Sequence, residues 1–463
     1  DAVINHISRQ SDWFQQYLRG EGPYTDYFIE ISPETDLSYV VRPRALPLLT
    51  PVPALGADGV DGDHGARAEG VRYVWTTFSD DQIDLNYTNP QVLLEIIDVL
   101  LFYVSQGAEI IRLDAIAYLW KELDTSCIHL PQTHAVVKLW RAVLDMVAPG
   151  VILITETNVP HEENISYFGD EGDEAQMVYQ FPLGPLVLHA FHTGNARKLT
   201  EWAASLETPS PNTTFFNFIA SHDGIGIRPA EGILTPDEVD ALVNRTLTHG
   251  GQVSYKNNPD GSRSVYELNI TLYDWLNNPN QPVSETDVRR FLASQAIMLS
   301  LAGVPGIYVH SLFGSRNCHP CVAETGRARS INREKFSSAA LEAILNDPGS
   351  HQSQVLSGYL RMLHQRREHP AFHPNGANGG QKALSLHDGV FGILRTAPDR
   401  SETVLCLVNV SGEKIRVEVD VAGLGGNAHR VSWTDLMGGE EIAVRGGTLK
   451  IFLDAYQAVW LTV

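Results

Sequence analysis

Short apolar segments that end in polar residues recur along this chain, with amphipathic segments between them. They are "DAVINH" at 1–6, "EIIRLDA" at 109–115, "VILITETN" at 151–158, "TFFNFIASHDG" at 214–224 and "LAGVPGIYVH" at 301–310. Intervening segments such as "PQVLLEIIDVLLFYVSQG" have the apolar spacing of helices. Strands alternating with helices favour a parallel α/β fold. Polar residues at the carboxyl ends of successive strands further indicate a (β/α)₈ TIM barrel, in which those ends meet at one face.

Three regions depart from this pattern. Residues 24–70 are rich in Pro, Gly and Asp, which predicts a loop-rich subdomain inserted after a barrel strand. Residues 230–290 are expected to form a second, partly helical insertion. Residues 375–463 contain short alternating β segments separated by turn residues, as in an all-β sandwich domain. The catalytic barrel is therefore expected to comprise residues 1–23 and 71–374.

The charge balance excludes some partners. The net charge of −21 argues against nucleic acid and against anionic membranes. The sequence has no apolar run long enough to span a membrane. Its first residues lack a basic start followed by a long apolar stretch, so no signal peptide is predicted there.

The four cysteines are too few to suggest a disulfide framework in 463 residues. Cys318 and Cys321 form a lone C-x-x-C, "CHPC", and a zinc site would need two further ligands at suitable spacing. The pair is therefore expected to be an incidental feature of a loop, and the protein is expected in a reducing cytoplasm.

Arg112 and Asp114 lie two residues apart where a buried strand is predicted to end, so their side chains point to the same side. A carboxylate beside a guanidinium stays ionised. Taken alone, the pair fits a structural ion pair better than a nucleophile, because perturbed acids are not all catalytic.

Glu156 and Asp223 follow two other apolar segments, so a barrel would bring three acids to one face. Two carboxylates flanking a glycosidic bond are what retaining sugar chemistry requires, and a third can support the positive transition state. His6 and His222 lie at the same predicted face, which favours hydroxyl binding over a purely structural role.

"DAVINH", "IIRLDAIAY", "LITETN" and "ASHDGIG" resemble, in order, the four conserved segments of the α-amylase family, glycoside hydrolase family 13. "VRPRALP", "VWTTFSDDQIDLNY", "KELDTSC" and "INREKF" resemble its sucrose phosphorylase branch. The flanks "ASHDGIGIRPAEGIL" and "SLFGSRNCHPCVAETGRARSINREKF" are most similar to the subgroup acting on glucosylglycerate or glucosylglycerol.

The resemblance implies a retaining phosphorylase that transfers glucose to phosphate and releases α-glucose 1-phosphate. Asp114 would be the nucleophile, Glu156 the general acid/base and Asp223 the transition-state stabiliser. The resemblance also implies that Arg112 orients Asp114 and that His6 and His222 contact the sugar. With that context, Arg112 and Asp114 are better interpreted as a nucleophile and its orienting cation.

Arginine forks suit both phosphate and glycerate, and one segment is rich in them: Arg316, Arg327, Arg329 and Arg333. Arg333 is the main candidate for a sugar or phosphate contact, and Arg42 and Arg44 are further candidates. A solvated basic loop is the structural alternative. No metal or organic cofactor is implied; the calcium ion common in the wider family is not expected in this branch.

In the family, two strands with their helices precede the first of these segments, so N-terminal barrel units are expected to be missing here. The same three acids would also serve a sucrose or sucrose 6'-phosphate phosphorylase, or an α-glucoside hydrolase or transglucosidase. A barrel kept only for binding is a further alternative, which the presence of all three acids disfavours. The oligomeric state is not predicted.

Overall fold

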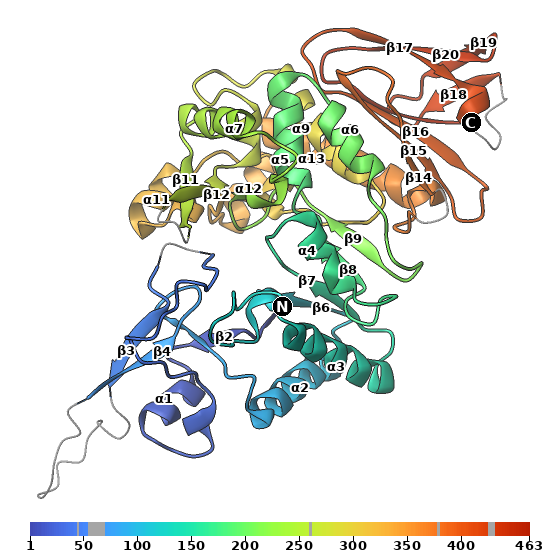
Figure 1. Ribbon diagram of the computed structural model, residues 1–463. Coiled ribbons are helices and arrows are strands. Elements are labelled where there is room, and N and C mark those ends of the chain that lie inside the picture. The colour runs from blue at the N-terminus through green and yellow to red at the C-terminus, as the bar shows by residue number, and fades with distance from the viewer. Residues whose placement is uncertain (44–45, 54–69, 259–261, 377–379, 425–430) are drawn as a thin grey trace, which may run out of the picture. The chain divides into compact units, whose positions relative to one another are not determined.

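The computed structural model describes residues 1–43, 46–53, 70–258, 262–376, 380–424 and 431–463 (Figure 1). The chain divides into two compact units. Unit 1 comprises Asp1–Thr157, Glu162–Val178 and Tyr255–Tyr266. Unit 2 comprises Asn158–His161, Tyr179–Ser254 and Glu267–Val463.

Unit 1 is built on parallel strands in the order β1-β6-β7-β8. These are β1 (Ala2–Val3), β6 (Ile110–Asp114), β7 (Ile152–Thr155) and β8 (Met177–Tyr179). Val3 pairs with Asp114 and Leu113 pairs with Thr155, so neighbouring strands end at the same level. The parallel α/β pattern is confirmed. β8 was missed because its apolar run is only three residues long.

The helices of this part of the chain include two predicted amphipathic segments, at 90–107 and 133–150. The helices are α1 (Asp12–Leu18), η1 (Tyr24–Asp26), α2 (Pro90–Ser105), η2 (Ile116–Tyr118), α3 (Pro131–Val147), α4 (His161–Ile165) and η3 (Ser166–Phe168). Asn89 caps α2 by accepting from the backbone of Gln91, and Pro90 is its first residue. α3 buries Val137, Trp140 and Leu144 on one face and connects β6 to β7.

Two small antiparallel pairs accompany this sheet. β2 (His6–Ser8) pairs with β5 (Gln82–Asp84), and β3 (Leu49–Pro53) pairs with β4 (Val71–Trp75). Within the predicted insertion, residues 44–45 and 54–69 lie outside the described residues. The described part is anchored by a hydrophobic cluster: Leu37, Val40, Leu48, Trp75 and Cys127. The backbone of Val41 also donates to Ser126 O over 3.0 Å.

Unit 2 contains parallel strands β9 (Thr214–Asn217) and β13 (Val304–Pro305). The predicted strand at 301–310 is wrong beyond Pro305, where α10 (Val309–Leu312) begins after a short connection. Proline has no N–H for a ladder, and Gly306 makes the last bond, to Asn217 O over 2.7 Å.

The other helices up to residue 372 belong to unit 2. They are α5 (Leu183–Thr193), α6 (Arg197–Ala204), η4 (Arg228–Ala230), α7 (Pro236–Thr248), α8 (Leu272–Leu276), α9 (Glu285–Ser300), α11 (His319–Thr325), η5 (Ala328–Asn332), α12 (Ser338–Leu345), α13 (His351–Glu368) and η6 (Pro370–Phe372). β10 (Ile225–Gly226), β12 (Arg263–Asn269) and β11 (Gln252–Asn257) form an antiparallel sheet in that order. None of the helices in the described ranges is long and apolar enough to cross a membrane.

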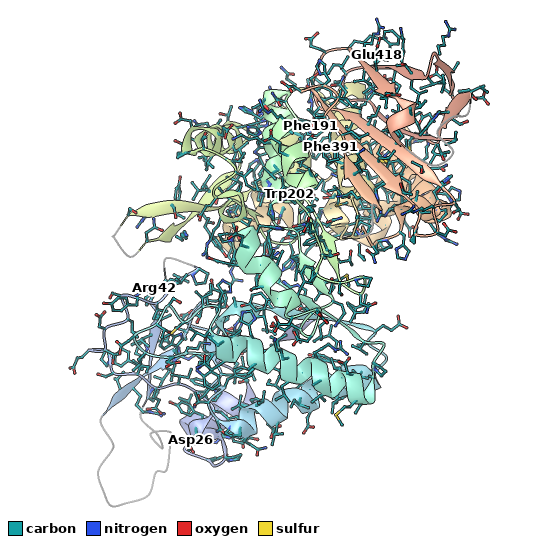
Figure 2. The ribbon with its side chains drawn as sticks, turned by 45° about the vertical axis from the view of Figure 1, so that its right-hand side comes forward. Asp26, Arg42, Phe191, Trp202, Phe391 and Glu418 are labelled. Carbon is teal, nitrogen blue, oxygen red and sulfur yellow. A yellow bond between two sulfur atoms is a disulfide. The ribbon has the colours of Figure 1, made fainter. Side chains whose placement is uncertain are left out.

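The predicted C-terminal all-β domain is confirmed as an antiparallel arrangement with the order β14-β15-β16-β21-β18-β19-β20-β17. Its strands are β14 (Gln381–Ala383), β15 (Val390–Thr396), β16 (Thr403–Asn409), β17 (Ile415–Asp420), β18 (Ser432–Asp435), β19 (Glu441–Arg445), β20 (Thr448–Leu453) and β21 (Ala458–Thr462), with η8 (Val421–Leu424) after β17. One hydrophobic core joins strands from both ends of this order, including Leu405, Val417 and Leu453. Phe391 of β15 and Trp202 of α6 are both buried (Figure 2).

The carboxyl end of α9 is bound by a buried arginine from the C-terminal domain. Arg395 Nη1 donates to Ser300 O over 2.9 Å. Its Nε and Nη2 donate to Gly380 O and His373 O over 3.0 and 2.6 Å. A cation at a helix carboxyl end is favourable because the last carbonyls carry partial negative charge.

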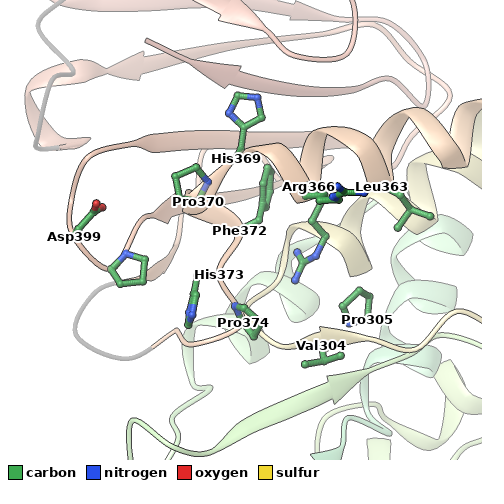
Figure 3. A pocket seen from close by; sticks show the side chains of 12 residues that line it. Val304, Pro305, Leu363, Arg366, His369, Pro370, Phe372, His373, Pro374 and Asp399 are labelled. Carbon is green, nitrogen blue, oxygen red and sulfur yellow. The ribbon is translucent and has the colours of Figure 1, made fainter.

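Arg366 of α13 supports the same end of α9. It donates to Leu299 O and, over 2.7 Å, to Gly303 O, and its guanidinium lies 5.7 Å from the ring centre of Phe372. Arg366 and Phe372 line a cavity of about 650 Å³ with β13 and the turn at Asp399 (Figure 3). Two guanidiniums thus bind carbonyls at the carboxyl end of α9.

We expect Arg395→Met to lower the free energy of unfolding by about 3 kcal/mol or more, because three carbonyls, two of them in buried bonds, lose their donor. Urea unfolding followed by circular dichroism measures the change. The matched control is Arg367→Met, since this arginine side chain is 86% exposed and should change stability by less than about 1 kcal/mol. Equal effects of the two substitutions would contradict the prediction.

Candidate active site

Asp114 is the last residue of β6, and Arg112 precedes it on the same face. Arg112 Nη1 donates to Asp114 Oδ1 over 2.6 Å and to Asp1 Oδ1 over 2.8 Å. The Asp114 side chain is 27% exposed, so it remains accessible while its orientation is held. Ala115 follows with φ of 52°, which turns the chain sharply into η2 after the carboxylate.

Glu156 follows β7 directly, and its backbone N–H donates to Leu113 O over 3.1 Å. Its Oε2 accepts from the backbone of Ala115 over 3.3 Å and lies 3.8 Å from Arg112 Nη2. One guanidinium therefore contacts both carboxylates. This keeps them close together, as the acid pair of a retaining glycoside-cleaving enzyme must be.

His6 opens β2, three residues beyond the residue that pairs with Asp114. Its imidazole is buried, with Nε2 2.6 Å from Gln82 Nε2 and the ring centre 5.2 Å from that of Phe78. Its Nδ1 lies 3.3 Å from Asn5 Nδ2. The imidazole is thus fixed from both nitrogens, three residues beyond the end of β1.

A buried ion pair lies behind His6. Lys121 Nζ is 2.6 Å from Asp84 Oδ2 and donates to Asn5 Oδ1 over 2.9 Å, and the Lys121 and Asp84 side chains are 4% and 0% exposed. Thr77 adds two bonds to Asp84, from its backbone and its hydroxyl, over 2.9 and 2.6 Å. Burial lowers the pKa of Lys121, and Asp84 opposes that change. Sequence analysis missed this pair, because nothing in "DLNY" or "KELD" marks either residue as buried.

The ion pair of Lys121 and Asp84 occupies oxygen atoms that could otherwise bind a cation. Asn5 and Asp84 offer the oxygen atoms that a hard cation such as Ca²⁺ prefers, and the Lys121 ammonium already takes one from each. Among the described residues, no group of three or more His, Cys, Asp or Glu side chains is placed to hold a metal ion.

Asp223 lies in unit 2, and the expectation that it ends a strand is wrong. β9 ends at Asn217, six residues earlier, and β10 begins at Ile225. Asp223 is held instead by the segment at 329–333. Arg329 Nη1 donates to Asp223 Oδ1, and Arg333 Nη2 is 3.2 Å from the same oxygen.

The backbone around Asp223 is fixed by the same segment. Asn332 Nδ2 donates to Ser221 O and Asp223 O over 3.1 and 3.0 Å. Arg333 Nε donates to His222 O over 2.5 Å. The His222 side chain is 57% exposed, with Nε2 3.8 Å from Asp223 Oδ2. The structure therefore brings together Asp223, His222 and Arg333 as one group.

Glu267 is a further member of this group that the sequence did not reveal. Arg329 binds it with two N–H groups, from Nε to Oε2 over 3.0 Å and from Nη2 to Oε1. The Glu267 side chain is only 4% exposed. Gly224 permits this approach, since a Cβ there would lie 2.8 Å from Glu267 Cβ. The alternating pattern of "VYELN" could have suggested an inward-facing glutamate, but not its partner.

We expect Glu267→Gln to reduce kcat/KM by roughly tenfold to a hundredfold, because a charge-assisted bond to Arg329 contributes about 1.5–3 kcal/mol. Initial rates at several substrate concentrations measure the loss. The matched control is Glu207→Gln, an exposed glutamate of the same unit, which should retain full activity. Full activity of Glu267→Gln would contradict the prediction, because it would show that Arg329 holds Asp223 without the negative charge of Glu267.

The other arginines differ in their surroundings. Arg316 donates to the buried Asp274 and, over 2.9 Å, to Pro279 O, so its charge serves a structural ion pair. Arg42 is half-buried in the segment tied to Ser126 (Figure 2). Arg44 lies outside the described residues.

Comparison with known proteins adds to this geometry. Residues 1–225 match the family model described as the α-amylase catalytic domain, and residues 382–460 match the maltogenic amylase C-terminal domain. The chain is 50% identical to the glucosylglycerate phosphorylase of Allomeiothermus silvanus over 100% of its own length and 76% of that protein. It is 44% identical to the glucosylglycerate phosphorylase of Escherichia coli, covering 100% of this chain and 77% of that one.

The chain belongs to the α-amylase family. A solved structure of the family, sucrose 6F-phosphate phosphorylase from Thermoanaerobacter thermosaccharolyticum, aligns with a TM-score of 0.72 at 22% identity. The alignment covers 89% of this chain and 78% of that structure. The α-amylase-family fold is thus a TIM barrel followed by an antiparallel β domain. Within the family, this chain is a glycoside phosphorylase of the sucrose phosphorylase type.

Proposed function

We propose that this protein transfers a glucosyl unit reversibly from glucosylglycerate to phosphate, giving α-glucose 1-phosphate and glycerate. The 50% identity to a glucosylglycerate phosphorylase along the whole chain carries this proposal. The geometry supports a double displacement, because one guanidinium holds a strand-end carboxylate and a second carboxylate beside it.

In the proposed reaction, Asp114 Oδ attacks the anomeric carbon while Glu156 protonates the departing glycerate oxygen. A glucosyl ester of Asp114 forms. Phosphate then attacks the anomeric carbon, Glu156 takes its proton, and the ester bond to Asp114 breaks. Arg112 holds the Asp114 carboxylate in a fixed orientation for the attack, because it donates to Oδ1.

Asp223 is proposed to stabilise the positive charge on the sugar ring in the transition state. Two guanidiniums, from Arg329 and Arg333, converge on its Oδ1, and Arg329 is also paired with Glu267. An exposed guanidinium suits binding of an anion, and both phosphate and the glycerate carboxylate are anions. Arg333, with a side chain 40% exposed, is the proposed anion contact.

Further contacts are proposed for the sugar and acceptor. His6 and His222 are assigned to glucose hydroxyls, and Arg42 to the acceptor because its segment is tied to the loop that follows Asp114. We also propose barrel boundaries of 1–23 and 71–374, insertions at 24–70 and 230–290, and a β domain from 375. A cytoplasmic location is proposed from the two buried free thiols, Cys127 and Cys406.

The test is to incubate the protein with α-glucose 1-phosphate and one acceptor at a time: glycerate, glycerol, fructose, fructose 6-phosphate or none. Phosphate release that requires glycerate supports the proposal. Release that requires another acceptor would assign that substrate instead. Equal release without any acceptor would indicate transfer to water and would contradict phosphorolysis.

A further inference from the structure

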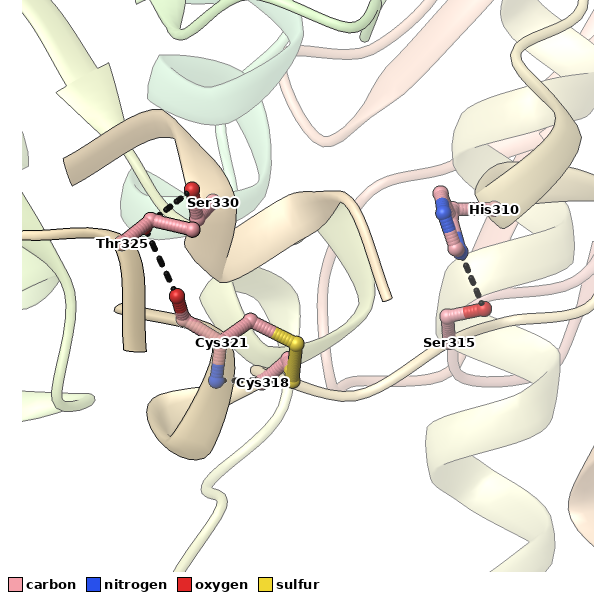
Figure 4. Close-up of a disulfide and its surroundings, with 6 residues drawn as sticks. All are labelled: His310, Ser315, Cys318, Cys321, Thr325 and Ser330. Carbon is pink, nitrogen blue, oxygen red and sulfur yellow. Dashed lines mark hydrogen bonds between the residues drawn. A yellow bond between two sulfur atoms is a disulfide. The ribbon is translucent and has the colours of Figure 1, made fainter. Parts of the chain in front are cut away.

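Cys318 and Cys321 form a disulfide, which corrects the expectation of an incidental cysteine pair (Figure 4). The bridge closes the first turn of α11, where Cys318 Sγ also accepts from the backbone of Cys321 over 3.3 Å. The spacing of the two cysteines in the sequence could not distinguish a disulfide from two free thiols. The distance between the two sulfur atoms depends on how the first turn of the helix folds. The proposed reaction makes no use of this bridge.

The bridge is connected to the cluster around Asp223 by short bonds. The backbone of Cys318 donates to Ile331 O over 2.8 Å. The next residue, Asn332, donates to Asp223 O over 3.0 Å. The hydroxyl of Thr325, at the end of α11, donates to Ser330 Oγ over 2.7 Å (Figure 4).

These contacts make α11 and η5 one folded segment, residues 318–333, which we call the cysteine-arginine segment. It carries Arg329 and Arg333 at one end and the disulfide at the other. The bridge spans four residues. Closing a ring of that size disfavours opened conformations of residues 318–321 by roughly twentyfold.

We propose that Cys318–Cys321 is a thiol–disulfide exchange site, whose reduction by a dithiol loosens the cysteine-arginine segment and weakens binding of phosphate. The statement about phosphate rests on the proposed function, whereas the exchange and the loosening do not. In a reducing compartment, a disulfide in a folded enzyme is typical of redox sensing.

The exchange is a two-electron step. A thiolate of the dithiol attacks Cys321 Sγ, which forms a mixed disulfide and releases Cys318 as a thiolate that takes up a proton. The second thiol of the reductant then attacks its own sulfur in the mixed disulfide and releases Cys321 as a thiol. The protein gains two electrons and two protons, and the dithiol becomes a cyclic disulfide.

The exposure of the two cysteines favours attack of the reductant on Cys321. Cys318 is 8% exposed, whereas Cys321 is half-buried and lies beside the exposed His319 and Pro320. The free cysteines are protected: Cys127 is 2% exposed and Cys406 is fully buried. Burial also raises the pKa of the Cys406 thiol, which makes it a poor nucleophile.

The experiment compares the full chain oxidised and after treatment with dithiothreitol, with the thiols alkylated and counted by mass spectrometry. We expect two alkyl groups on the peptide containing Cys318 and Cys321 only after reduction, with Cys127 and Cys406 unmodified in the folded protein. We expect the KM for phosphate to rise several-fold, up to about twentyfold, and to return on reoxidation. Trypsin should cleave after the exposed Arg327 faster in the reduced form.

The C318A/C321A variant is expected to have the KM for phosphate and the cleavage rate of the reduced form. Dithiothreitol should change neither value. Equal KM values and equal cleavage rates for verified oxidised and reduced wild-type protein would overturn the proposal. Cysteines that can still be alkylated after treatment with an oxidant would also overturn the proposal. If the rate of trypsin cleavage depends on the redox state but the protein has no phosphorolysis activity, the result contradicts the proposed function and supports the exchange site.

Discussion

Asp114→Asn is expected to abolish glucosyl transfer, with kcat falling by roughly 10⁴-fold or more. The amide keeps the shape of the carboxylate but cannot form the glucosyl ester, and it no longer pairs as an anion with Arg112. Initial rates of phosphate release from α-glucose 1-phosphate measure the loss. With wild-type protein, a fluorinated glucosyl fluoride that releases its sugar slowly should leave one glucosyl group on the peptide containing Asp114.

The matched control is Asp124→Asn. Asp124 is exposed, and its φ of 64° suits asparagine as well as aspartate. This variant should keep wild-type activity, and both variants should unfold at temperatures close to that of the wild type. A glucosyl group found on Glu156, or substantial activity in Asp114→Asn, would reassign the nucleophile.

Lys121→Met is expected to lower the free energy of unfolding by about 3–5 kcal/mol, because it leaves the carboxylate of Asp84 buried without its cation. Asp84 is fully buried, so water cannot replace the ammonium. Urea unfolding of wild type and variant measures the difference. Activity should fall as well, because Asn5 loses its bond to Lys121 and lies next to His6.

Two further variants make this test specific. Lys138→Met removes an ammonium paired with the exposed Asp170 and Asp173, and should change stability by less than about 1 kcal/mol. Lys121→Met combined with Asp84→Asn should recover part of the loss, since the uncompensated charge is gone. A double variant as unstable as the sum of its two single variants would show that the pair contributes no coupling.

The strand-end chemistry of unit 1 could be predicted from the sequence because it depends on local periodicity. Arg112 and Asp114 share a face of one strand, and Glu156 follows the next, so parallel pairing alone brings them together. The position of Asp223 could not be predicted in this way. It lies six residues beyond its strand and is held by arginines more than a hundred residues later.

Residues whose roles depend on partners far away in the chain could not be identified from the sequence for the same reason. Glu267 and Lys121 look like ordinary surface residues until the fold buries them against Arg329 and Asp84. Arg316 was a candidate for anion binding by composition, and only its contact with Asp274 shows a structural role. The predicted strand at 301–310 ends early, because the chain makes only one more bond to β9 after Pro305, from Gly306 to Asn217 O, and then enters α10.

The bonds from Arg395 to the end of α9 have a consequence for the order in which the chain is made. Ser300 leaves the ribosome almost a hundred residues before the side chain that caps its helix. Nascent domains generally fold from the N-terminus as they emerge. Arg366 of α13 is made earlier and can bind Leu299 O, but the carbonyl of Ser300 lacks its donor until β15 has been synthesised. The last domain to appear therefore completes the folding of an earlier helix.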